Sequence, residues 1–526
     1  MVTLLDYGAG NVRSVVNAIK NLGYAVRLVE RPEDILAAEK LIFPGVGAFG
    51  SMMRVLHQKG FVQPLRWYLE QDRPFLGICL GLQALFQASE EAPEEEGLGF
   101  LKGVVRRFRV DLAVPHIGWN GIKPRKPSAL FQGLSGEEPF YFVHSYHVDP
   151  EDAGVVLTTT DYGVEFVSAV QKGRVAAVQF HPEKSGPTGL KILQNFLEDS
   201  KALSVLPPRA PVRTQLTKRI IACLDVRTND QGDLVVTKGD QYDVREKGQV
   251  RNLGKPVDFA RRYYEEGADE ITFLNITGFR DFPLMDVPML EVLRRTSENV
   301  FVPLTIGGGI RDYVDKDGTA YSALDVAAAY FRSGADKVSI GSDAVLIVEE
   351  VLRTGKATGR SAIETISRIY GSQAVVISID PRRVYVPLPT AVPHRVIETA
   401  LPGPQGERYC WYQCTVKGGR EGRPLDAITL AQVCEQLGAG EILLNCIDRD
   451  GTNSGFDVEL IQAVKEAVTI PVIASSGAGC AEHFLEVFTR TTAESALAAG
   501  IFHRNEVPIG AVKAYLQGKV PIRPVP

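Results

Sequence analysis

The chain has 526 residues, more than one hydrophobic core supports, so we expect at least two domains. Its composition, 45% hydrophobic and 23% charged, is typical of a soluble globular protein. A net charge of −5 gives no electrostatic reason to expect binding to nucleic acid or to an anionic membrane. No stretch approaches the roughly 20 apolar residues of a membrane span.

The N-terminus already has the pattern of a core strand, because Val2–Leu5 is apolar. We therefore expect no signal or transit segment and a cytoplasmic location, with a plastid protein lacking its transit peptide as the alternative. The seven cysteines, an odd number, suggest free thiols in a reducing compartment. Cys410 and Cys414 have no second pair of ligands nearby, so a zinc site is not expected.

Residues 1 to about 200 alternate short apolar runs with helical segments. Val2–Leu5, Ala25–Leu28 and Lys40–Phe43 predict strands, and Asn11–Leu22 has helical spacing. This α/β alternation predicts an open, mainly parallel sheet with helices on both faces. In such sheets the residues that carry chemistry lie at the carboxyl ends of the strands.

The stretch Pro74–Phe86, PFLGICLGLQALF, predicts a strand, a sharp turn and a helix. Cys79 stands between Gly77 and Gly81, which is the G-x-nucleophile-x-G pattern of a strained strand-to-helix elbow. The N-terminus of the following helix would favour the thiolate, which is the form that attacks. A buried, inert cysteine beside a glycine-rich turn is the alternative.

Two further stretches favour the nucleophile. His181 and Glu183 follow the apolar strand Val175–Val178 and offer a base and a carboxylate that orients it. A glycine-rich loop at residues 44–50 follows another apolar run, and the backbone N–H groups around Gly45 and Gly47 can point at a developing oxyanion.

These three motifs resemble those of the triad-type (class I) glutamine amidotransferases, and Tyr141–Tyr146 (YFVHSY) fits the same family. The resemblance covers Val2 to about Leu197. It implies cleavage of the side-chain amide of glutamine: Cys79 attacks, His181 acts as base, Glu183 orients it, and Gln83 helps to hold the substrate.

A boundary follows this first region. Residues 203–215 contain three prolines and no helical periodicity, which is typical of an extended, fairly stiff connector. We expect a first domain at 1–202, a linker at 203–216 and a second domain at 217–526.

The second domain shows a different regularity. Eight short apolar strands, most of them followed by a helical stretch, predict a (β/α)₈ barrel. The insertion Arg382–Arg423 interrupts them, and its segment Cys410–Val416 predicts part of a hairpin. The expected barrel strands are Ile220–Asp225, Glu270–Asn275, Val302–Ile306, Lys337–Gly341, Ala374–Asp380, Glu441–Cys446, Ile470–Ser475 and Ser495–Gly500.

The barrel repeats within itself, because Ile221–Asp225 is echoed by Val376–Asp380. Asp225 and Asp380 therefore take equivalent places on strands one and five. Two carboxylates that face each other across a barrel mouth suit general acid–base catalysis, one giving a proton while the other takes one. Capping of a loop or pairing with a lysine is the structural alternative.

Glycine-rich loops are duplicated as well, after strands three and seven. Such loops expose backbone N–H groups that bind phosphate without side-chain charge, so the pair predicts a substrate with a phosphate at each end. Ser342 after strand four and Gly500 after strand eight would complete the two cradles. The loop residues are Gly307, Gly308 and Gly309 in the first half and Ser476, Gly477, Ala478 and Gly479 in the second.

These features resemble the histidine-biosynthesis barrels, most closely the cyclase half of the imidazole glycerol phosphate synthase family, over Lys218 to Ala514. Lys218–Val226, Gly334–Ile340 and Ile447–Thr452 carry the resemblance. Both domains on one chain, glutaminase first, is the arrangement of this family in fungi and plants.

The resemblance implies a reaction. Ammonia released from glutamine attacks phosphoribulosyl-formimino-aminoimidazole carboxamide ribonucleotide and yields imidazole glycerol phosphate and aminoimidazole carboxamide ribotide. Asp225 and Asp380 supply acid and base, Lys238 closes over the substrate, and Asp448 and Asp450 orient it. Asn275 and Ser476 depart from the bacterial pattern, where Asp and Gly are usual.

Four residues of alternating charge precede or open strands one, two, four and six, so they lie at the bottom of the barrel, where a second domain can dock without blocking the mouth. In the family these positions form the salt-bridged gate of an ammonia channel, and an ordinary ring of ion pairs is the alternative. Lys184 and Asp336 are expected partners across the interface. The four gate residues are Arg219, Glu270, Lys337 and Glu441.

Three other functions remain as alternatives: a glutaminase with a different acceptor domain, an isomerase-type phosphosugar barrel of the histidine pathway, and a non-enzymatic metabolite sensor. The duplicated aspartates and phosphate loops disfavour the first, the fused glutaminase disfavours the second, and the intact triad disfavours the third. No cofactor motif or metal cluster is evident, so neither is expected. With both activities on one chain, a monomer acting on small molecules is expected.

Overall fold

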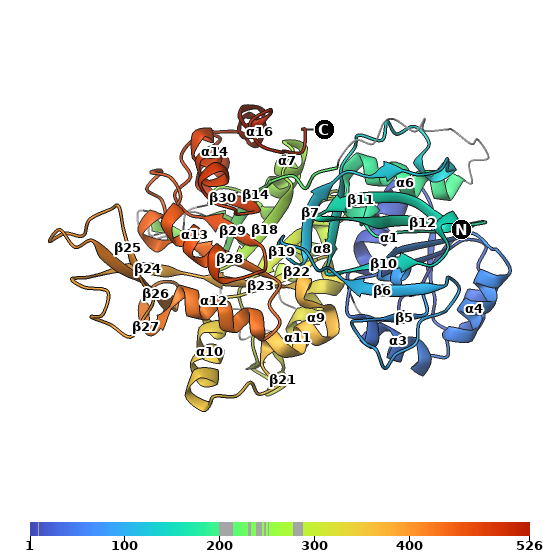
Figure 1. The fold of residues 1–526 in the computed structure, drawn as a ribbon, viewed down its shortest axis with the longest axis horizontal. Coiled ribbons are helices and arrows are strands. Elements are labelled where there is room, and N and C mark those ends of the chain that lie inside the picture. Colours follow the sequence, from blue (N-terminus) through green and yellow to red (C-terminus); the bar gives the residue numbers. More distant parts are fainter. Residues whose placement is uncertain are drawn as a thin grey trace.

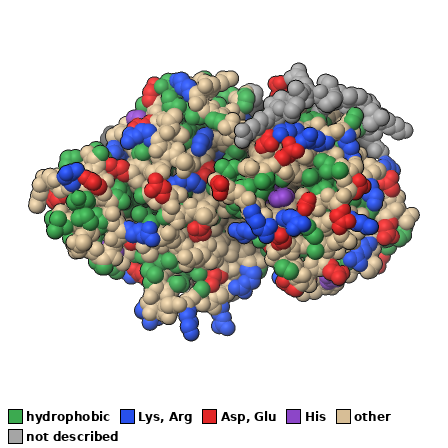
Figure 2. All heavy atoms as spheres, in the orientation of Figure 1, with side chains coloured by type: hydrophobic (Ala, Val, Ile, Leu, Met, Phe, Trp, Pro, Cys, Tyr) green, Lys and Arg blue, Asp and Glu red, His purple; other side chains and the backbone are tan. Residues whose placement is uncertain are grey.

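The computed structural model describes residues 1–8, 10–198, 214–229, 233–237, 245–246, 249–250, 252–276, 284 and 288–525. Two bodies lie side by side (Figure 1): residues up to 198 form one, drawn blue to teal, and residues from about 218 onward form the other, drawn green to red. In the part of the chain described, no helix is long and apolar enough to cross a membrane. Acidic and basic side chains are interspersed over the face drawn in Figure 2.

The first body is built on an 11-stranded sheet. Five of its strands run parallel, in the order β2-β1-β3-β4-β13, and the sheet continues with mostly antiparallel strands through β12, β10, β6 and β5, while β11 and β8 branch from β12. The strands are β1 (Val2–Leu4), β2 (Val26–Leu28), β3 (Leu41–Gly45), β4 (Phe75–Cys79), β5 (Ala88–Ser89), β6 (Gly103–Arg107), β8 (Lys123–Pro124), β10 (Tyr146–Pro150), β11 (Val156–Tyr162), β12 (Val164–Lys172) and β13 (Val175–Val178).

Helices cover this sheet, and their apolar stripes form its two cores. They are α1 (Val12–Asn21), α2 (Pro32–Ala37), α3 (Phe49–Gln58), α4 (Val62–Glu70), α5 (Leu80–Gln83) and α6 (Gly186–Glu198). A separate two-stranded sheet pairs β7 (His116–Asn120) with β9 (Phe140–His144). The three candidate motifs follow β3, β4 and β13, which are neighbours in the parallel part, so the predicted α/β sheet brings them to one edge.

The second body is a closed barrel, as the sequence predicts. Eight parallel strands follow one another around it, and pairing of the first with the last closes the ring. One further strand, β15 (Leu234–Thr237), extends β14 antiparallel. The barrel strands are β14 (Arg219–Thr228), β18 (Glu270–Asn275), β19 (Leu304–Gly307), β22 (Lys337–Ile340), β23 (Val375–Ile379), β28 (Glu441–Asn445), β29 (Val472–Ser475) and β30 (Ser495–Ala498).

Helices pack outside the barrel, and several begin at capping boxes. Ser322 and Asp325 cap the start of α9, and Ser361 and Glu364 cap α11, so that each satisfies N–H groups of the first turn. The helices are α7 (Pro256–Glu265), α8 (Pro288–Thr296), α9 (Ala323–Ser333), α10 (Ser342–Thr354), α11 (Ala362–Tyr370), α12 (Ala427–Gln436), α13 (Val458–Ala467), α14 (Ala481–Arg490), α15 (Gly500–His503) and α16 (Ile509–Leu516).

The insertion after β23 forms a four-stranded antiparallel sheet, larger than the predicted hairpin. Its central strand, β26 (Tyr409–Val416), contains the predicted segment and pairs with β24 (Pro381–Val386), β25 (Val396–Glu398) and β27 (Glu421–Asp426). Figure 1 shows this sheet at the end of the barrel away from the first body. All seven cysteines are free, including Cys410 and Cys414 on β26.

The first body docks on the floor of the barrel, where the strands begin. The Trp119 indole N–H donates to the Asp269 carbonyl at 3.1 Å, and the Gly186 N–H donates to the Phe301 carbonyl at 3.0 Å. Asp269 directly precedes β18, and Phe301 stands shortly before β19. The carboxyl ends of the barrel strands, where chemistry is expected, therefore stay uncovered by the first body.

Candidate active sites at the two ends of the barrel

Cys79 lies at a strained elbow between β4 and α5. Its φ is 52°, a left-handed conformation that residues with a side chain rarely adopt. Glycine is needed on both sides: a Cβ on Gly81 would lie 2.0 Å from the Phe43 carbonyl oxygen, and one on Gly77 would lie 2.7 Å from the Gly81 oxygen. The helix after the turn is one turn long, shorter than the sequence predicts.

His181 and Glu183 follow β13, the strand beside β4. His181 Nδ1 lies 2.8 Å from Glu183 Oε1, and both side chains are 3% exposed. Burial alone would lower the pKa of His181, but the charges of Glu183 and Cys79 raise it well above its usual value. His181 Nε2 makes no hydrogen bond of good geometry within the described residues, but a side-chain interaction with Cys79 is among the causes of the raised pKa of His181.

The glycine-rich loop lies beside the nucleophile, because β3 pairs with β4 so that Gly45 is opposite Cys79. The Tyr7 hydroxyl donates to the Val46 carbonyl at 3.0 Å. The Ala48 N–H donates at 3.1 Å to the carbonyl of Ile369, which lies on α11 of the barrel. Gly47 stands between these two bonds, so the loop is held from both bodies.

Two side chains near Cys79, one buried and one half-buried, escape the motif analysis. Gln179 Nε2 donates to Cys79 Sγ at 3.3 Å, and its Oε1 accepts from Gln83 Nε2 at 3.3 Å. The position of Gln179, two residues before His181, is the signal that could have found it. Glu91 accepts from the Phe49 N–H at 2.9 Å, and burial raises the pKa of this carboxyl to about 7. Its acid-rich surroundings in the sequence give no sign of burial.

Asp225 and Asp380 lie at the other end of the barrel, toward the carboxyl ends of β14 and β23. These two strands stand four places apart in the ring of eight, so the carboxylates come from opposite walls of the mouth. Asn445 Nδ2 donates to Asp380 Oδ1 at 2.9 Å. Burial raises the pKa of Asp380, the hydrogen bond from Asn445 opposes that shift, and the charge of Asp450 adds to it.

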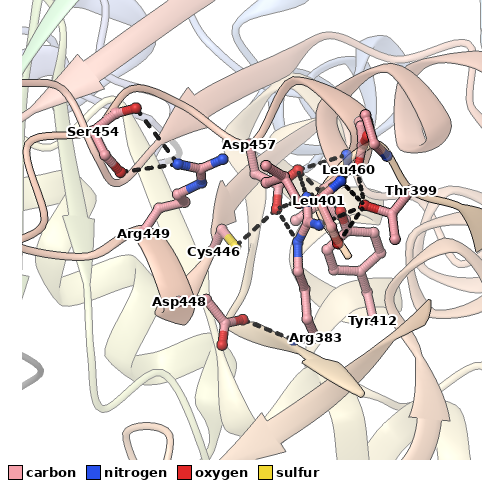
Figure 3. A network of polar contacts seen from close by, with 12 residues as sticks. Arg383, Thr399, Leu401, Tyr412, Cys446, Asp448, Arg449, Ser454, Asp457 and Leu460 are labelled. Atoms are coloured by element: carbon pink, nitrogen blue, oxygen red, sulfur yellow. Dashed lines mark hydrogen bonds and ion pairs between the residues drawn. The ribbon is translucent and has the colours of Figure 1, made fainter. Parts of the chain in front are cut away.

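The insertion sheet holds the acidic loop at this mouth (Figure 3). Asp448 Oδ2 accepts from the Arg383 backbone N–H at 2.7 Å. The Arg383 guanidinium makes two hydrogen bonds to Asp457, of 2.9 and 2.8 Å, and the Tyr412 hydroxyl donates to the same carboxylate at 2.9 Å. Both members of the ion pair are buried, so β24 and β26 fix the loop that carries Asp448 and Asp450.

The two predicted phosphate loops differ in detail. A Cβ on Gly308 would lie 2.1 Å from the Asn275 carbonyl oxygen, and one on Gly477 would lie 2.2 Å from the Gly455 oxygen. Ser476 has a φ of 72°, so a residue with a side chain occupies a left-handed position. Gly309 and Gly500 lie at the same rim, after β19 and at the start of α15.

Ser342 begins α10 and accepts from the Lys417 backbone N–H at 3.0 Å, so the insertion also touches the first cradle. Lys238 lies outside the described residues. Among the residues that are described, no group of three or more His, Cys, Asp or Glu side chains could hold a metal ion.

The four charges predicted for the floor form a closed ring. Arg219 contacts Glu270 at 2.8 Å and also Glu441, while Lys337 Nζ lies 2.7 Å from Glu270 and 2.6 Å from Glu441. All four side chains are at most 1% exposed. Burial raises the pKa of Glu441, but the charges of Arg219 and Lys337 lower it below its usual value overall. The ring is therefore internally paired, since each side chain contacts two of opposite sign.

The Cys79 site and this ring are adjacent. Lys184, next to Glu183, forms an ion pair with Asp336 at 2.7 Å, and Asp336 immediately precedes Lys337. Asn11 Nδ2 donates to Asp336 Oδ1 at 2.8 Å. Tyr141, whose carbonyl accepts from the His181 N–H at 2.9 Å, is buried beside the ring. Burial raises its pKa first, and the charges of Glu270 and Glu441 add to that shift.

Fold and geometry thus define a two-site class of enzyme: a cysteine–histidine–glutamate centre on an α/β sheet, docked on the floor of a barrel with paired carboxylates at its mouth. Comparison with known families agrees with this class. Residues 3–200 match the family model described as glutamine amidotransferase class-I, and residues 219–508 match the model described as histidine biosynthesis protein.

Relatives match over nearly the whole chain. The chloroplastic imidazole glycerol phosphate synthase hisHF of Arabidopsis thaliana is 60% identical over 98% of this chain and 88% of its own. The imidazole glycerol phosphate synthases hisHF of Emericella nidulans and Schizosaccharomyces pombe are 57% and 54% identical, over 98% of both chains. The chain therefore belongs to the imidazole glycerol phosphate synthase family in its fused form, which joins a glutamine amidotransferase to a histidine-biosynthesis cyclase.

Proposed function

We propose that the chain hydrolyses glutamine at Cys79 and passes the ammonia along the barrel axis to a diphosphorylated ribonucleotide bound at the mouth. One observation carries this proposal. The Cys79 site lies against the floor ring and the carboxylate pair lies at the opposite rim, so the barrel axis is the shortest route between them.

In the first half-reaction, Cys79 Sγ attacks the side-chain carbonyl carbon of glutamine. N–H groups of the loop at Gly45 and Gly47 stabilise the oxyanion. His181 Nε2 gives its proton to the leaving ammonia and then activates a water that hydrolyses the thioester to glutamate, while Glu183 holds the other ring nitrogen. The raised pKa of His181 supports a protonated imidazole in the resting site, which is the form that gives the proton.

Gln83 and Glu91 are the groups that we propose for holding the amino-acid end of glutamine. A carboxylate is complementary to the α-ammonium group, and Glu91 is half-buried with no basic residue bonded to it among those that the structure describes. A bound cation would compensate the burial that raises its pKa to about 7.

Ammonia would have to pass the ring of Arg219, Glu270, Lys337 and Glu441, for which we propose the role of a gate. The ring closes the axis as it stands, so one ion pair must separate for passage. Lys337 is the candidate to move, because a flexible four-carbon stem carries its ammonium group, whereas the Arg219 guanidinium is a rigid planar fork. A closed route matters because water would protonate ammonia and remove its nucleophilicity.

At the mouth, ammonia attacks the substrate and ring closure releases imidazole glycerol phosphate and aminoimidazole carboxamide ribotide. The raised pKa of Asp380 supports the role of acid for this residue, which leaves Asp225 as base. The proposed phosphate contacts are the N–H groups of Gly308, Gly309, Ser476 and Gly477 with Ser342 and Gly500; Lys238 is proposed to close over the substrate and Asp450 to orient it.

The remaining expectations belong to this proposal: a monomer, domains at 1–202 and 217–526 with the linker 203–216, no cofactor, and a location in the cytoplasm or, alternatively, the plastid stroma.

The deciding experiment compares glutamine hydrolysis with and without the diphosphorylated acceptor. Strong stimulation and one glutamate per imidazole glycerol phosphate are expected. Equal rates with and without acceptor would contradict the coupled reaction.

A further inference from the structure

A pair of buried histidines joins strands β7 and β9 of the two-stranded sheet. His116 on β7 and His144 on β9 face each other, with His116 Nδ1 3.1 Å from His144 Nε2. Both are at most 3% exposed, and His116 stacks on Tyr162 and Phe142 with ring centroids 4.0 and 5.0 Å away. Two polar rings in an aromatic box are costly to bury unless their nitrogens are satisfied.

The partners of the pair fix which nitrogens carry protons. His144 Nδ1 lies 2.7 Å from the Tyr146 carbonyl oxygen, which can only accept, so Nδ1 is the protonated nitrogen and Nε2 accepts. His116 Nδ1 must then donate, and its Nε2 accepts from Asn120 Nδ2 at 3.4 Å. Burial lowers the pKa of both rings, that of His144 to about 3, which keeps them neutral and this proton order unique.

The histidine pair and the nucleophile are linked through the Tyr146 carbonyl. The Tyr146 carbonyl that accepts from His144 also accepts from Gln83 Nε2 at 3.2 Å, and Gln83 contacts Gln179, which donates to Cys79 Sγ. At the other end of the pair, Asn120 is the neighbour of Trp119, whose indole donates to the Asp269 carbonyl on the barrel floor. Hydrogen bonds from the histidine pair on one side and from Gln83 on the other therefore meet at the Tyr146 carbonyl, which accepts from both.

We infer that His116 and His144 are positioning residues for the glutaminase: their hydrogen bonds hold the Tyr146 carbonyl in place and thereby the orientation of the Gln83 and Gln179 amides at Cys79. An amide turned by half a rotation would present a donor where an acceptor is needed, so the orientation decides whether glutamine is held for attack. This inference rests on the proposed glutaminase function and extends it to residues on the interface side.

The test uses two substitutions of His116, H116F and H116Q. H147Q, at a nearby histidine, is the control. Phe fills the aromatic box but removes donor and acceptor, whereas Gln supplies one of each. His147 packs on Phe108 and Phe166, which also contact the His116 ring, yet among the described residues its Nδ1 reaches the Val148 carbonyl and not the histidine pair. We expect H116F to lower kcat for glutamine hydrolysis about tenfold or more, as misplacement of a binding group does, and H116Q and H147Q to stay close to the parent.

Cyclisation supported by added ammonium is measured in each variant, together with Tm. The rate of ammonium-supported cyclisation should be unchanged in H116F. An unchanged rate would show that the variant is folded and that its defect lies in the glutaminase. Glutamine hydrolysis by H116F at the parental rate would overturn the inference, and so would an equal loss in H147Q, because packing of the aromatic box would then suffice. Absence of cyclisation in the parent enzyme would contradict the proposed function instead, while the hydrolysis data would still test the histidines.

Discussion

The two candidate sites are built in different ways. The Cys79 centre gathers its residues from three neighbouring strands of one sheet and places the nucleophile by a strained φ of 52°. The mouth of the barrel takes equivalent residues from opposite strands and relies on loops that bind through backbone N–H groups. One site is a compact, buried constellation, while the other is a wide, two-fold rim suited to a long substrate with two anionic ends.

Their surroundings differ as well. The Cys79 site adjoins the other body, through Ile369 at its loop and Asp336 beside Lys184. In the part of the chain that the structure describes, the contacts that hold the mouth come from the barrel and its insertion sheet. The comparison suggests that the Cys79 site depends on docking of the two bodies and that the mouth does not. The nitrogen source separates the two sites experimentally, because added ammonium bypasses the Cys79 site.

The largest expected effect comes from Cys79→Ala. Removing the nucleophile should lower glutamine-dependent cyclisation by about 10⁴-fold or more, because the other residues of such a triad act only through it. Ammonium-dependent cyclisation should stay at the parental rate. Both rates are measured from product formation at saturating acceptor. A parallel loss with ammonium would show that the two sites are not separable and would break the comparison.

Asp380→Asn should produce the reverse pattern. Loss of a general acid lowers the rate by about 10²–10⁴-fold, and it should do so with either nitrogen source, while basal glutamine hydrolysis continues. Glutamate and imidazole glycerol phosphate are quantified in the same reaction. Full cyclisation by D380N would assign the proton transfer to another group.

The pH dependence of the mouth sharpens this assignment. If Asp380 acts as acid, kcat for cyclisation falls as pH rises through its pKa, which burial raises above the usual value. Asn445 bonds the charged carboxylate and so lowers that pKa. Asn445→Leu should therefore move the alkaline limb of the profile to higher pH, measured at constant free ammonia. A shift to lower pH would contradict the role of acid.

Lys337→Met tests the ring between the sites. It leaves Glu270 and Glu441 buried with one cation for two carboxylates. Removing one partner of a buried pair should lower the free energy of unfolding by about 3–5 kcal/mol. A gate that no longer closes should also release ammonia, so that more than one glutamate forms per imidazole glycerol phosphate. Denaturant unfolding and product ratios measure the two effects separately. A destabilised enzyme with a ratio of one would make the ring purely structural.

Much of this architecture can be predicted from the sequence, because the local spacing of apolar residues and glycines determines the strands, helices and turns. The strand Glu270–Asn275 is predicted with the bounds that the structure shows. The elbow around Cys79 follows from Gly77 and Gly81, because a tight strand-to-helix turn leaves no room for a Cβ at either position. What stays hidden depends on contacts between distant segments. The insertion forms a four-stranded sheet through pairings that no local period encodes. Glu91 becomes a candidate only through burial, which its acid-rich segment does not indicate.

The smallest expected effect concerns Ser476, where the second phosphate loop departs from the first. A left-handed φ costs a residue with a side chain about 1–2 kcal/mol, and glycine would relieve this at an entropic cost of about 0.5–1 kcal/mol. Ser476→Gly should therefore raise the free energy of unfolding by about 0.5 kcal/mol. Its neighbour Ser475, in the regular strand β29, is the matched control, and Ser475→Gly should lower stability. Equal destabilisation by both would mean that the Ser476 side chain contributes a contact worth more than its strain.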